Sequence, residues 1–251
     1  MNYIKYIIIL LVVPIFSQFG KNIVQYSTFD WHYIQTEYFD IYYYDTQVNA
    51  DYVAEESKNA YNRISKAIGW ELTNRIPIII YNSHNDFQQT NVIDMYMPEG
   101  VGGVTELYKN RVVIPYDAEH KKFKDVLHHE LVHAFINDYL YKGNAINMQD
   151  QNIKPIPLWM NEGLAEFLTE SWSTESDMWI RDLVINGEQL PTFNQLNGYL
   201  AYRGGQSIWK FIIEVLDVSY LTKETNAPTI IASIFRSISN GGDLNEAFKN
   251  N

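Results

Sequence analysis

The stretch Asp125-Val-Leu-His-His-Glu-Leu-Val-His-Ala-Phe-Ile136 has helical spacing and contains the pattern His-Glu-x-x-His at residues 129–133. Residues four apart lie on one face of an α-helix, so the imidazoles of His129 and His133 can converge on one metal ion. Glu130 is one residue further along, where its carboxylate can reach a water on that metal rather than the metal itself. Apolar residues share the histidine face, so we expect both rings to point inward, where a metal would satisfy their nitrogens. The alternative is a pair of core histidines without a metal.

A second helical stretch, residues 157–167, has proline in its first turn, where a helix tolerates it. Glycine and alanine at positions 163 and 165 are small, as close packing against a metal-bearing helix would require. The stretch begins a row of glutamates spaced four residues apart: Glu162, Glu166 and Glu170. Such a row is usually a solvated acidic face.

A third metal ligand is needed, because a catalytic zinc is held by three protein side chains and keeps one position open. Two histidines and one glutamate form a known set, so a glutamate of this row is the best candidate. Tyr139 stands where a metzincin would have a third histidine, and Asp138 is rotated away from the histidine face. His128 is about 100° around the helix from His129, so we expect it to have a solvent-facing or supporting role.

The two motifs, His129-Glu-Leu-Val-His133 and Trp159-Met-Asn-Glu162-Gly-Leu-Ala165, resemble the gluzincin clan of zinc metallopeptidases. In that clan the glutamate of the W-x-x-E-G element is the third zinc ligand, which implies Glu162 here. An acidic residue one turn later commonly hydrogen-bonds a zinc-binding histidine, and Glu166 holds the matching position. The compact variant known as the peptidase MA-like domain is the most similar, over residues 75–215. The spacing between the motifs is longer than is familiar in the clan, so the loop over residues 143–157 would be an insertion.

Two further elements follow from the same resemblance. Tyr202-Arg-Gly-Gly205 resembles the Y-x-x-G element of gluzincin aminopeptidases, whose tyrosine donates to the tetrahedral intermediate. The alternative for Tyr202 is a packing role at a helix start. Gly102, Gly103 and Val104 stand where the clan's edge strand follows the cleft, so they would pair with the substrate backbone. The same glycines are also compatible with a bulge or a turn.

Strand patterns precede helical patterns along the chain. Aromatic and β-branched residues are typical of strands, and from residue 119 onward the spacing is helical. The expected elements before that point are strands within Tyr33–Tyr44, a helix over Gln47–Ile68, and strands at Ile76–Tyr81, Val101–Glu106 and Arg111–Pro115. We therefore expect an α+β fold, in which a small mixed β-sheet in the N-terminal half packs on a mainly helical C-terminal half, as in zincins.

The composition limits the classes of function. The 251 residues have a net charge of −11, 46% hydrophobic residues and no cysteine. These values exclude an intrinsically disordered chain, disulfides and thiolate metal sites. The negative charge argues against nucleic acid and anionic membranes as partners. A transition-metal site in this chain must therefore use histidine and carboxylate ligands.

The first 17 residues resemble a cleaved secretory signal, with Lys5 before an apolar run from Ile7 to Phe16. The run is shorter than the roughly 20 apolar residues that a membrane span needs, and no later stretch reaches that length. An uncleaved anchor is the alternative. We expect residues 18–240 to form a zincin-like peptidase domain and residues 241–251 a tail or the start of a linker, in a protein exported to the periplasm or the extracellular space.

The start of the mature chain, residues 18–22 with Tyr26 and Phe29-Asp-Trp31, resembles exported bacterial proteins in which a peptidase-like domain precedes a Tol-type β-propeller. The resemblance implies a propeller domain or another envelope component as a partner, besides a peptide or protein substrate.

The expected activity is peptide-bond hydrolysis with one zinc ion per chain. Zinc held by His129, His133 and Glu162 would activate a water, Glu130 would be the general base, and Tyr202 would polarise the carbonyl. One alternative is a zinc-containing binding or structural module of an envelope assembly, without turnover. Another is a metal-free fold. The sequence does not distinguish an aminopeptidase from an endopeptidase.

Overall fold

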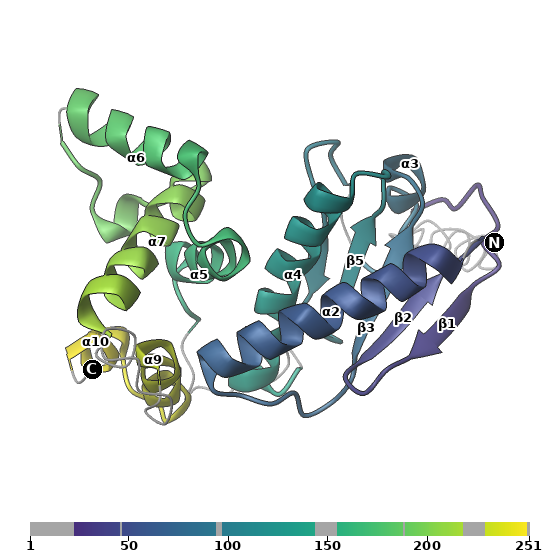
Figure 1. Cartoon of the computed structure of the whole chain (residues 1–251), viewed down its shortest axis with the longest axis horizontal. Helices are drawn as coiled ribbons and strands as arrows, with labels where there is room; N and C mark the ends of the chain where they lie inside the picture. Colours follow the sequence, from purple (N-terminus) through teal and green to yellow (C-terminus); the bar gives the residue numbers. More distant parts are fainter. Residues whose placement is uncertain are drawn as a thin grey trace, which may run out of the picture.

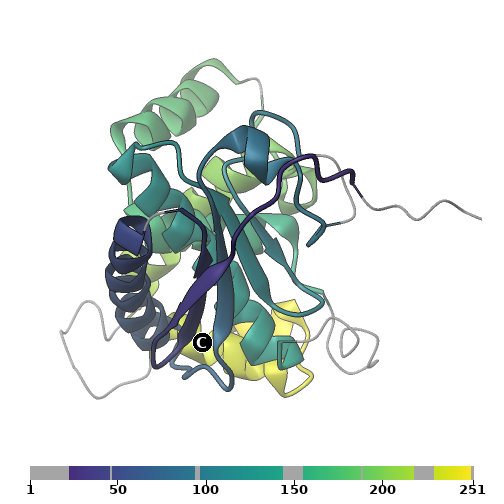
Figure 2. The same cartoon turned by 90° about the vertical axis from the view of Figure 1, so that its right-hand side faces the viewer.

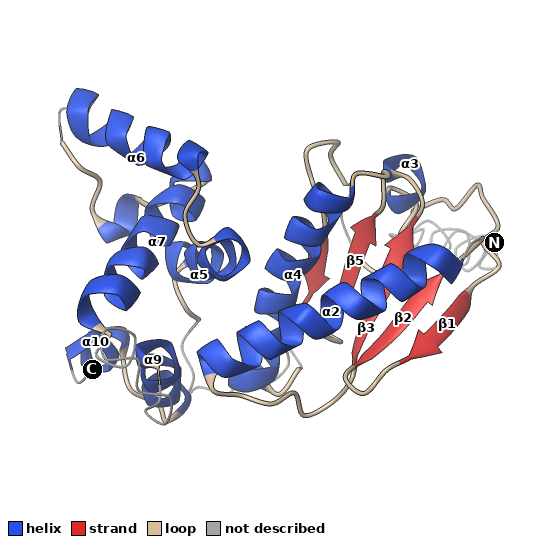
Figure 3. Cartoon of the chain, in the orientation of Figure 1, coloured by secondary structure: helices blue, strands red, loops and turns tan. Residues whose placement is uncertain are grey.

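A computed structural model describes residues 23–45, 47–93, 97–143, 155–187, 189–217 and 229–249. Among these residues, the N-terminal half forms a five-stranded sheet with its covering helices, and the C-terminal half forms helices (Figure 1, Figure 3). The predicted α+β class is confirmed.

The sheet is mixed and has the order β1-β2-β3-β5-β4. The three central strands are parallel, and each edge strand pairs with its neighbour in the antiparallel direction. In β2 and β3 buried residues alternate with half-buried ones, which is the two-residue period of a strand. The strands are β1 (His32–Gln35), β2 (Phe39–Tyr43), β3 (Ile76–Tyr81), β4 (Val104–Glu106) and β5 (Arg111–Pro115).

Two long helices, α2 (Gln47–Ile68) and α4 (His120–Tyr141), lie against the same face of the sheet (Figure 2). They form the main hydrophobic core with the strands, and this core continues into the helical half. The other face packs against the short helix α3 (His84–Phe87) and the segment around Phe29. Nearly every residue of α4 after Leu127 is buried, so the histidine pattern lies on the most central helix of the fold.

The helical half begins with α5, which packs against both α4 and α7. Pro157 is the N-cap residue of α5, in agreement with the predicted helix start. The elements of this half are α5 (Leu158–Glu170), α6 (Thr174–Asn186), a 3-10 helix (Phe193–Gln195), α7 (Tyr199–Phe211), a π-helical turn (Ile212–Leu216), α9 (Ile230–Ser239) and α10 (Leu244–Lys249).

Glycines make the closest contact between α5 and α7. A Cβ atom on Gly205 would lie 2.8 Å from the Cα of Gly163 and would overlap the backbone of Trp159. The two helices therefore touch backbone to backbone. The absence of a side chain at Gly163 allows α7 to approach α5. The prediction that Gly163 packs against the metal-bearing helix α4 is therefore wrong.

Some predictions fall on segments outside the described residues. The proposed signal peptide, residues 1–17, lies outside them, as do residues 144–154 of the expected loop. In the segment 241–251, helix α10 forms and Ala247 is fully buried, so folded structure continues beyond residue 240. Within the described part of the chain, no helix has both the length and the apolar character of a membrane span.

Candidate metal centre

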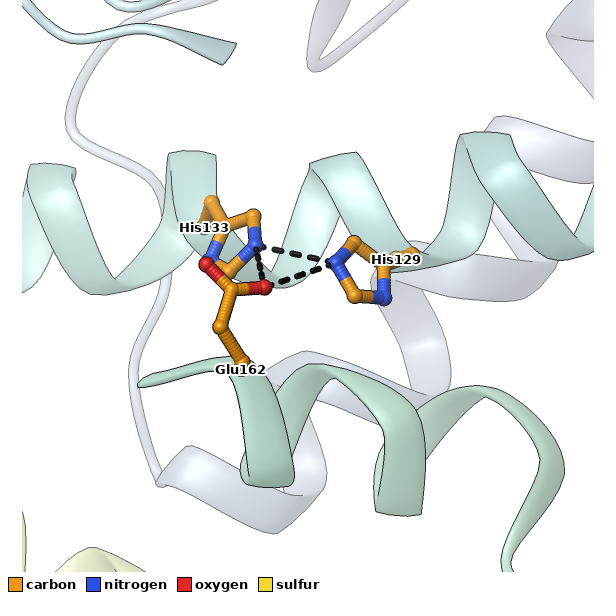
Figure 4. Close-up of side chains that lie close together, drawn as sticks. All are labelled: His129, His133 and Glu162. Atoms are coloured by element: carbon orange, nitrogen blue, oxygen red, sulfur yellow. Dashed lines mark hydrogen bonds and ion pairs between the residues drawn. The ribbon is translucent and has the colours of Figure 1, made fainter. Parts of the chain in front are cut away.

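Three potential metal ligands meet between α4 and α5 (Figure 4). The Nε2 atoms of His129 and His133 are 3.1 Å apart, and Oε2 of Glu162 lies 3.2 Å from each of them. Ligand atoms held about 2.1 Å from a tetrahedral zinc would be separated by about 3.4 Å, so this triangle is close to the size that one ion requires. His129, His133 and Glu162 can therefore hold a metal ion.

The neighbour of His129 fixes its tautomer. Nδ1 of His129 lies 3.1 Å from Oε1 of Glu166, and a carboxylate only accepts hydrogen bonds, so Nδ1 carries a proton. In the neutral ring Nε2 then directs a lone pair toward Glu162 and His133. Three electron-rich atoms facing one point repel one another unless a cation lies among them. The donor set thus fits a divalent metal.

In the absence of a metal, a proton meets the same demand for positive charge. Burial lowers the pKa of His129, but the carboxylates of Glu162 and Glu166 outweigh burial and raise this pKa to about 10. Burial raises the pKa of Glu162, yet its hydrogen bonds with His129 and His133 hold that pKa well below the usual range. The carboxylate of Glu162 is therefore ionised and available to a cation.

Arg203 of α7 holds Glu166 in place. Its Nη1 atom lies 2.7 Å from Oε2 of Glu166, and its Nη2 atom lies 3.4 Å from Oε1 of Glu175. Burial raises the pKa of Glu166, but His129 and Arg203 more than offset this and lower it. The series Arg203–Glu166–His129 thus orients the imidazole toward the triangle. Arg203 was missed in the sequence, where its only signal is its place beside Tyr202.

Glu130 is 8% exposed and is held by the edge strand β4. The hydroxyl of Thr105 lies 2.7 Å from Oε2 of Glu130 and 2.8 Å from the backbone oxygen of the same residue. A hydroxyl has one proton, so Oε2 and the backbone oxygen of Glu130 share this one donor. Thr105 was also missed, because nothing local in the sequence connects it with Glu130.

The predicted substrate strand is shorter than expected. β4 begins at Val104, and Gly102 and Gly103 precede it. A Cβ atom on Gly103 would lie 2.8 Å from Cγ1 of Val126 and 3.1 Å from Cγ of Glu130, so the backbone passes directly over α4 here. Gly103 lines the hollows on both sides of the triangle, and Gly102 lines one of them.

Tyr202 of α7 completes the wall of the site. Its ring stacks on that of His129, with centroids 5.9 Å apart and an interplanar angle of 13°. Burial and the carboxylate of Glu162 raise the pKa of Tyr202 above its ordinary value. The phenol therefore keeps its proton at neutral pH and can act as a hydrogen-bond donor in the cleft.

His128 faces away from the triangle and toward α2. It is 5% exposed, with Nδ1 3.0 Å from Nη2 of Arg63 and Nε2 3.3 Å from Oε2 of Glu56. Arg63 also donates to the backbone oxygen of Thr169 on α5. Of the two roles expected for His128, burial excludes the solvent-facing one; the residue belongs to a buried network that joins α2, α4 and α5.

Two acidic residues considered as ligands lie outside the triangle. Asp138 accepts hydrogen bonds from Trp70 Nε1 and Thr73 Oγ1, at 2.9 and 2.7 Å. Glu170 is exposed at the end of α5. Asp138 is therefore turned away from the histidine face, as its spacing predicts.

Comparisons with known proteins gave no match. The chain matches no protein-family model, and no curated protein matches it in sequence. The functional proposal therefore rests on the sequence motifs and on the geometry and chemistry of the site.

Proposed function

We propose that this protein is a zinc-dependent peptidase that hydrolyses peptide bonds with an activated water and Glu130 as general base. The main support is the presence in one cleft of three converging ligand atoms and a further carboxylate, that of Glu130, on the helix that carries both histidines. A purely structural metal site needs no such carboxylate.

The ligand set favours zinc over other divalent metals. Two imidazole nitrogens and one carboxylate oxygen are typical of catalytic zinc sites that leave a fourth position open. When bound there, zinc supplies a Lewis acid that lowers the pKa of a coordinated water to about 7. The resemblance of the two motifs to gluzincins agrees with this choice.

The protein groups around the triangle have separate roles in the proposed reaction. Glu130 accepts the proton of the attacking water and passes it to the leaving amine. Thr105 contacts Oε2 of Glu130, which leaves Oε1 for proton transfer. The protonated phenol of Tyr202 donates to the oxygen that becomes negatively charged. Glu166, held by Arg203, keeps His129 in the tautomer that a metal requires.

The proposed setting is outside the cytoplasm, on a peptide or protein substrate. The location follows from the signal-like pattern of the first 17 residues. The proposed partner is a β-propeller or another envelope component, because the start of the mature chain resembles exported proteins of that kind.

The decisive experiment combines metal analysis with one substitution. We expect about one zinc per chain by mass spectrometry, and we expect Glu130→Gln to retain the zinc while its cleavage of a peptide library falls at least about 100-fold. Glu55→Gln is the matched control, because it makes the same change at an exposed position on α2 that lines neither hollow and should leave cleavage unchanged. Cleavage at the wild-type rate by Glu130→Gln would contradict the role of the base.

A zinc-containing binding or structural module is the second candidate. The observation in its favour is that the ligands come from two helices, so a metal would fasten α4 to α5 whether or not a reaction occurs. This candidate predicts one zinc per chain, stabilisation by zinc, and no cleavage of any peptide in a broad library.

A further inference from the structure

The cleft over the triangle has two ends. One hollow, of about 420 Å³, contains His129, Glu130 and His133 and extends past His133. A second, of about 490 Å³, shares His129, Glu130 and Tyr202 with the first and extends toward the start of α4. One extended ligand lying across the triangle would therefore enter both ends.

The end beyond His133 is lined mainly by apolar side chains, with two amides, those of Asn137 and Asn161, in its wall. Asn137, a polar residue of this wall, already donates from Nδ2 to the backbone oxygen of Leu107 and to Oδ1 of Asn110. Among the described residues, the triangle and Glu130 supply the only charged side chains that line this end. Its apolar side chains come from the edge strand, the end of α4 and the segment before α5: Val104, Leu107, Ile136, Tyr141 and Ile156.

The opposite end has a different chemistry. It is lined by charged side chains that form ion pairs. Nζ of Lys121, for example, lies 2.7 Å from Oδ2 of Asp125. The charged residues in its lining, apart from those of the triangle and Glu130, are Asp125, Glu166, Glu170 and Arg203. Because one end is mainly apolar and the other is charged, a peptide bound across the triangle would have a preferred direction and a preferred side chain at each end.

We propose that the substrate is an extended peptide with a large apolar side chain, such as leucine, next to the cleaved bond and over the His133 end of the cleft. This inference rests on the proposed peptidase function. Among the described strands β4 pairs with β5 alone, so its outer edge is available to a peptide backbone. A side chain held there is removed from water by apolar groups, which favours leucine and disfavours a polar side chain without a partner.

Peptide hydroxamates, which bind zinc, test this preference without requiring turnover. The zinc-loaded protein is titrated by calorimetry with two series of these peptides. In one series the peptide extends from the hydroxamate toward the amino side, and in the other toward the carboxyl side. Each series has a form with leucine and a form with asparagine beside the hydroxamate. In the series that enters the His133 end, we expect the leucine form to bind at least about 10-fold more tightly. Leu107→Asn, at a residue 38% exposed on the rim, should remove most of this difference. Leu190→Asn, at a leucine 57% exposed outside the cleft, is the matched control and should preserve it.

The possible results separate this inference from the peptidase function. Equal binding of leucine and asparagine forms in both series, or a preference unchanged by Leu107→Asn, would overturn the apolar end and would leave a cleavage activity that depends on Glu130 untouched. Selective binding without cleavage of any peptide would support the apolar end and contradict hydrolysis. A chain that binds no zinc contradicts both proposals.

Discussion

At the scale of single residues, Glu130 depends on a contact that the edge strand supplies. Thr105 is the residue of β4 whose hydroxyl reaches the Glu130 carboxylate, and this carboxylate is almost buried. A carboxylate with a fixed donor on one oxygen presents the other oxygen in a defined direction. We therefore treat Thr105 as a positioning residue for the proposed base.

Replacement of Thr105 by valine keeps the shape of the side chain and removes the hydroxyl. A hydrogen bond to a charged group contributes about 1.5–3 kcal/mol, so we expect Thr105→Val to lower kcat about 10- to 100-fold, with zinc content unchanged. Steady-state kinetics with zinc analysis measures both quantities. Thr105→Ser restores the hydroxyl and should recover most of kcat; failure of serine to do so would indicate that valine acts through packing alone.

Arg203 affects the proposed metal site through two successive contacts, first with Glu166 and then from Glu166 to His129. Partners that orient a metal ligand typically account for about 10- to 100-fold in metal affinity, so Arg203→Gln should weaken zinc binding by this amount. Competition with a chromophoric chelator measures the change. Arg181→Gln removes an exposed arginine from an ion pair with Asp177 and should leave zinc affinity unchanged. Equal affinities in the two variants would show that Arg203 is not needed to orient His129.

At the scale of elements, the packing of α5 on α7 depends on the absence of side chains at Gly163 and Gly205. A methyl group at either position would overlap backbone atoms of the other helix, which cannot move aside as a flexible side chain does. The helices must separate to accommodate it, which would disturb Glu162, directly before Gly163, and Tyr202, three residues before Gly205.

Gly163→Ala and Gly205→Ala should therefore each lower the free energy of unfolding by at least about 1–3 kcal/mol, as expected when a well-packed contact is overfilled. Urea unfolding followed by circular dichroism measures this change. Gly100→Ala is the control, because its Cβ would meet no atom within 4 Å. A Gly163→Ala variant as stable as Gly100→Ala would show that the two helices do not pack in this way.

The sequence was informative where the signal is local. Helical spacing predicted that His129 and His133 share a site, because residues four apart lie on one helix face. The resemblance of the second motif to gluzincins implied Glu162 as their partner. It did not reveal contacts between distant segments: Thr105 and Glu130 are 25 residues apart, and Arg203 and Glu166 are 37 apart. The length of β4 and the partner of Gly163 also depend on how α4, α5 and α7 approach one another. No pattern within a single helix contains that information.

At the scale of the whole molecule, the triangle lies at the junction of the two halves. His129 and His133 belong to α4, which packs on the sheet, whereas Glu162 belongs to α5, which packs on α7 (Figure 1). A metal bound to all three residues would therefore join the halves and stabilise the folded state relative to the unfolded one.

Zinc should thus raise the melting temperature of the whole chain. At a free zinc concentration 100-fold above Kd the folded state gains about 2.7 kcal/mol, which corresponds to about 5–10 °C for a chain of this size. Calorimetry with zinc and with a chelator measures the difference. In Glu162→Gln, which removes the ligand charge, the difference should largely disappear; a shift equal to that of the wild type would mean that zinc binds elsewhere.

The division of the triangle between the halves also affects when the proposed enzyme becomes active. During synthesis the two histidines leave the ribosome before Glu162, and Tyr202 and Arg203 follow later still. A partial chain therefore lacks the complete set of groups, however well its sheet has formed. Under the proposed function, a chain would cleave peptides only after α5 and α7 have folded onto α4, because only then do Glu162 and Tyr202 lie beside the two histidines.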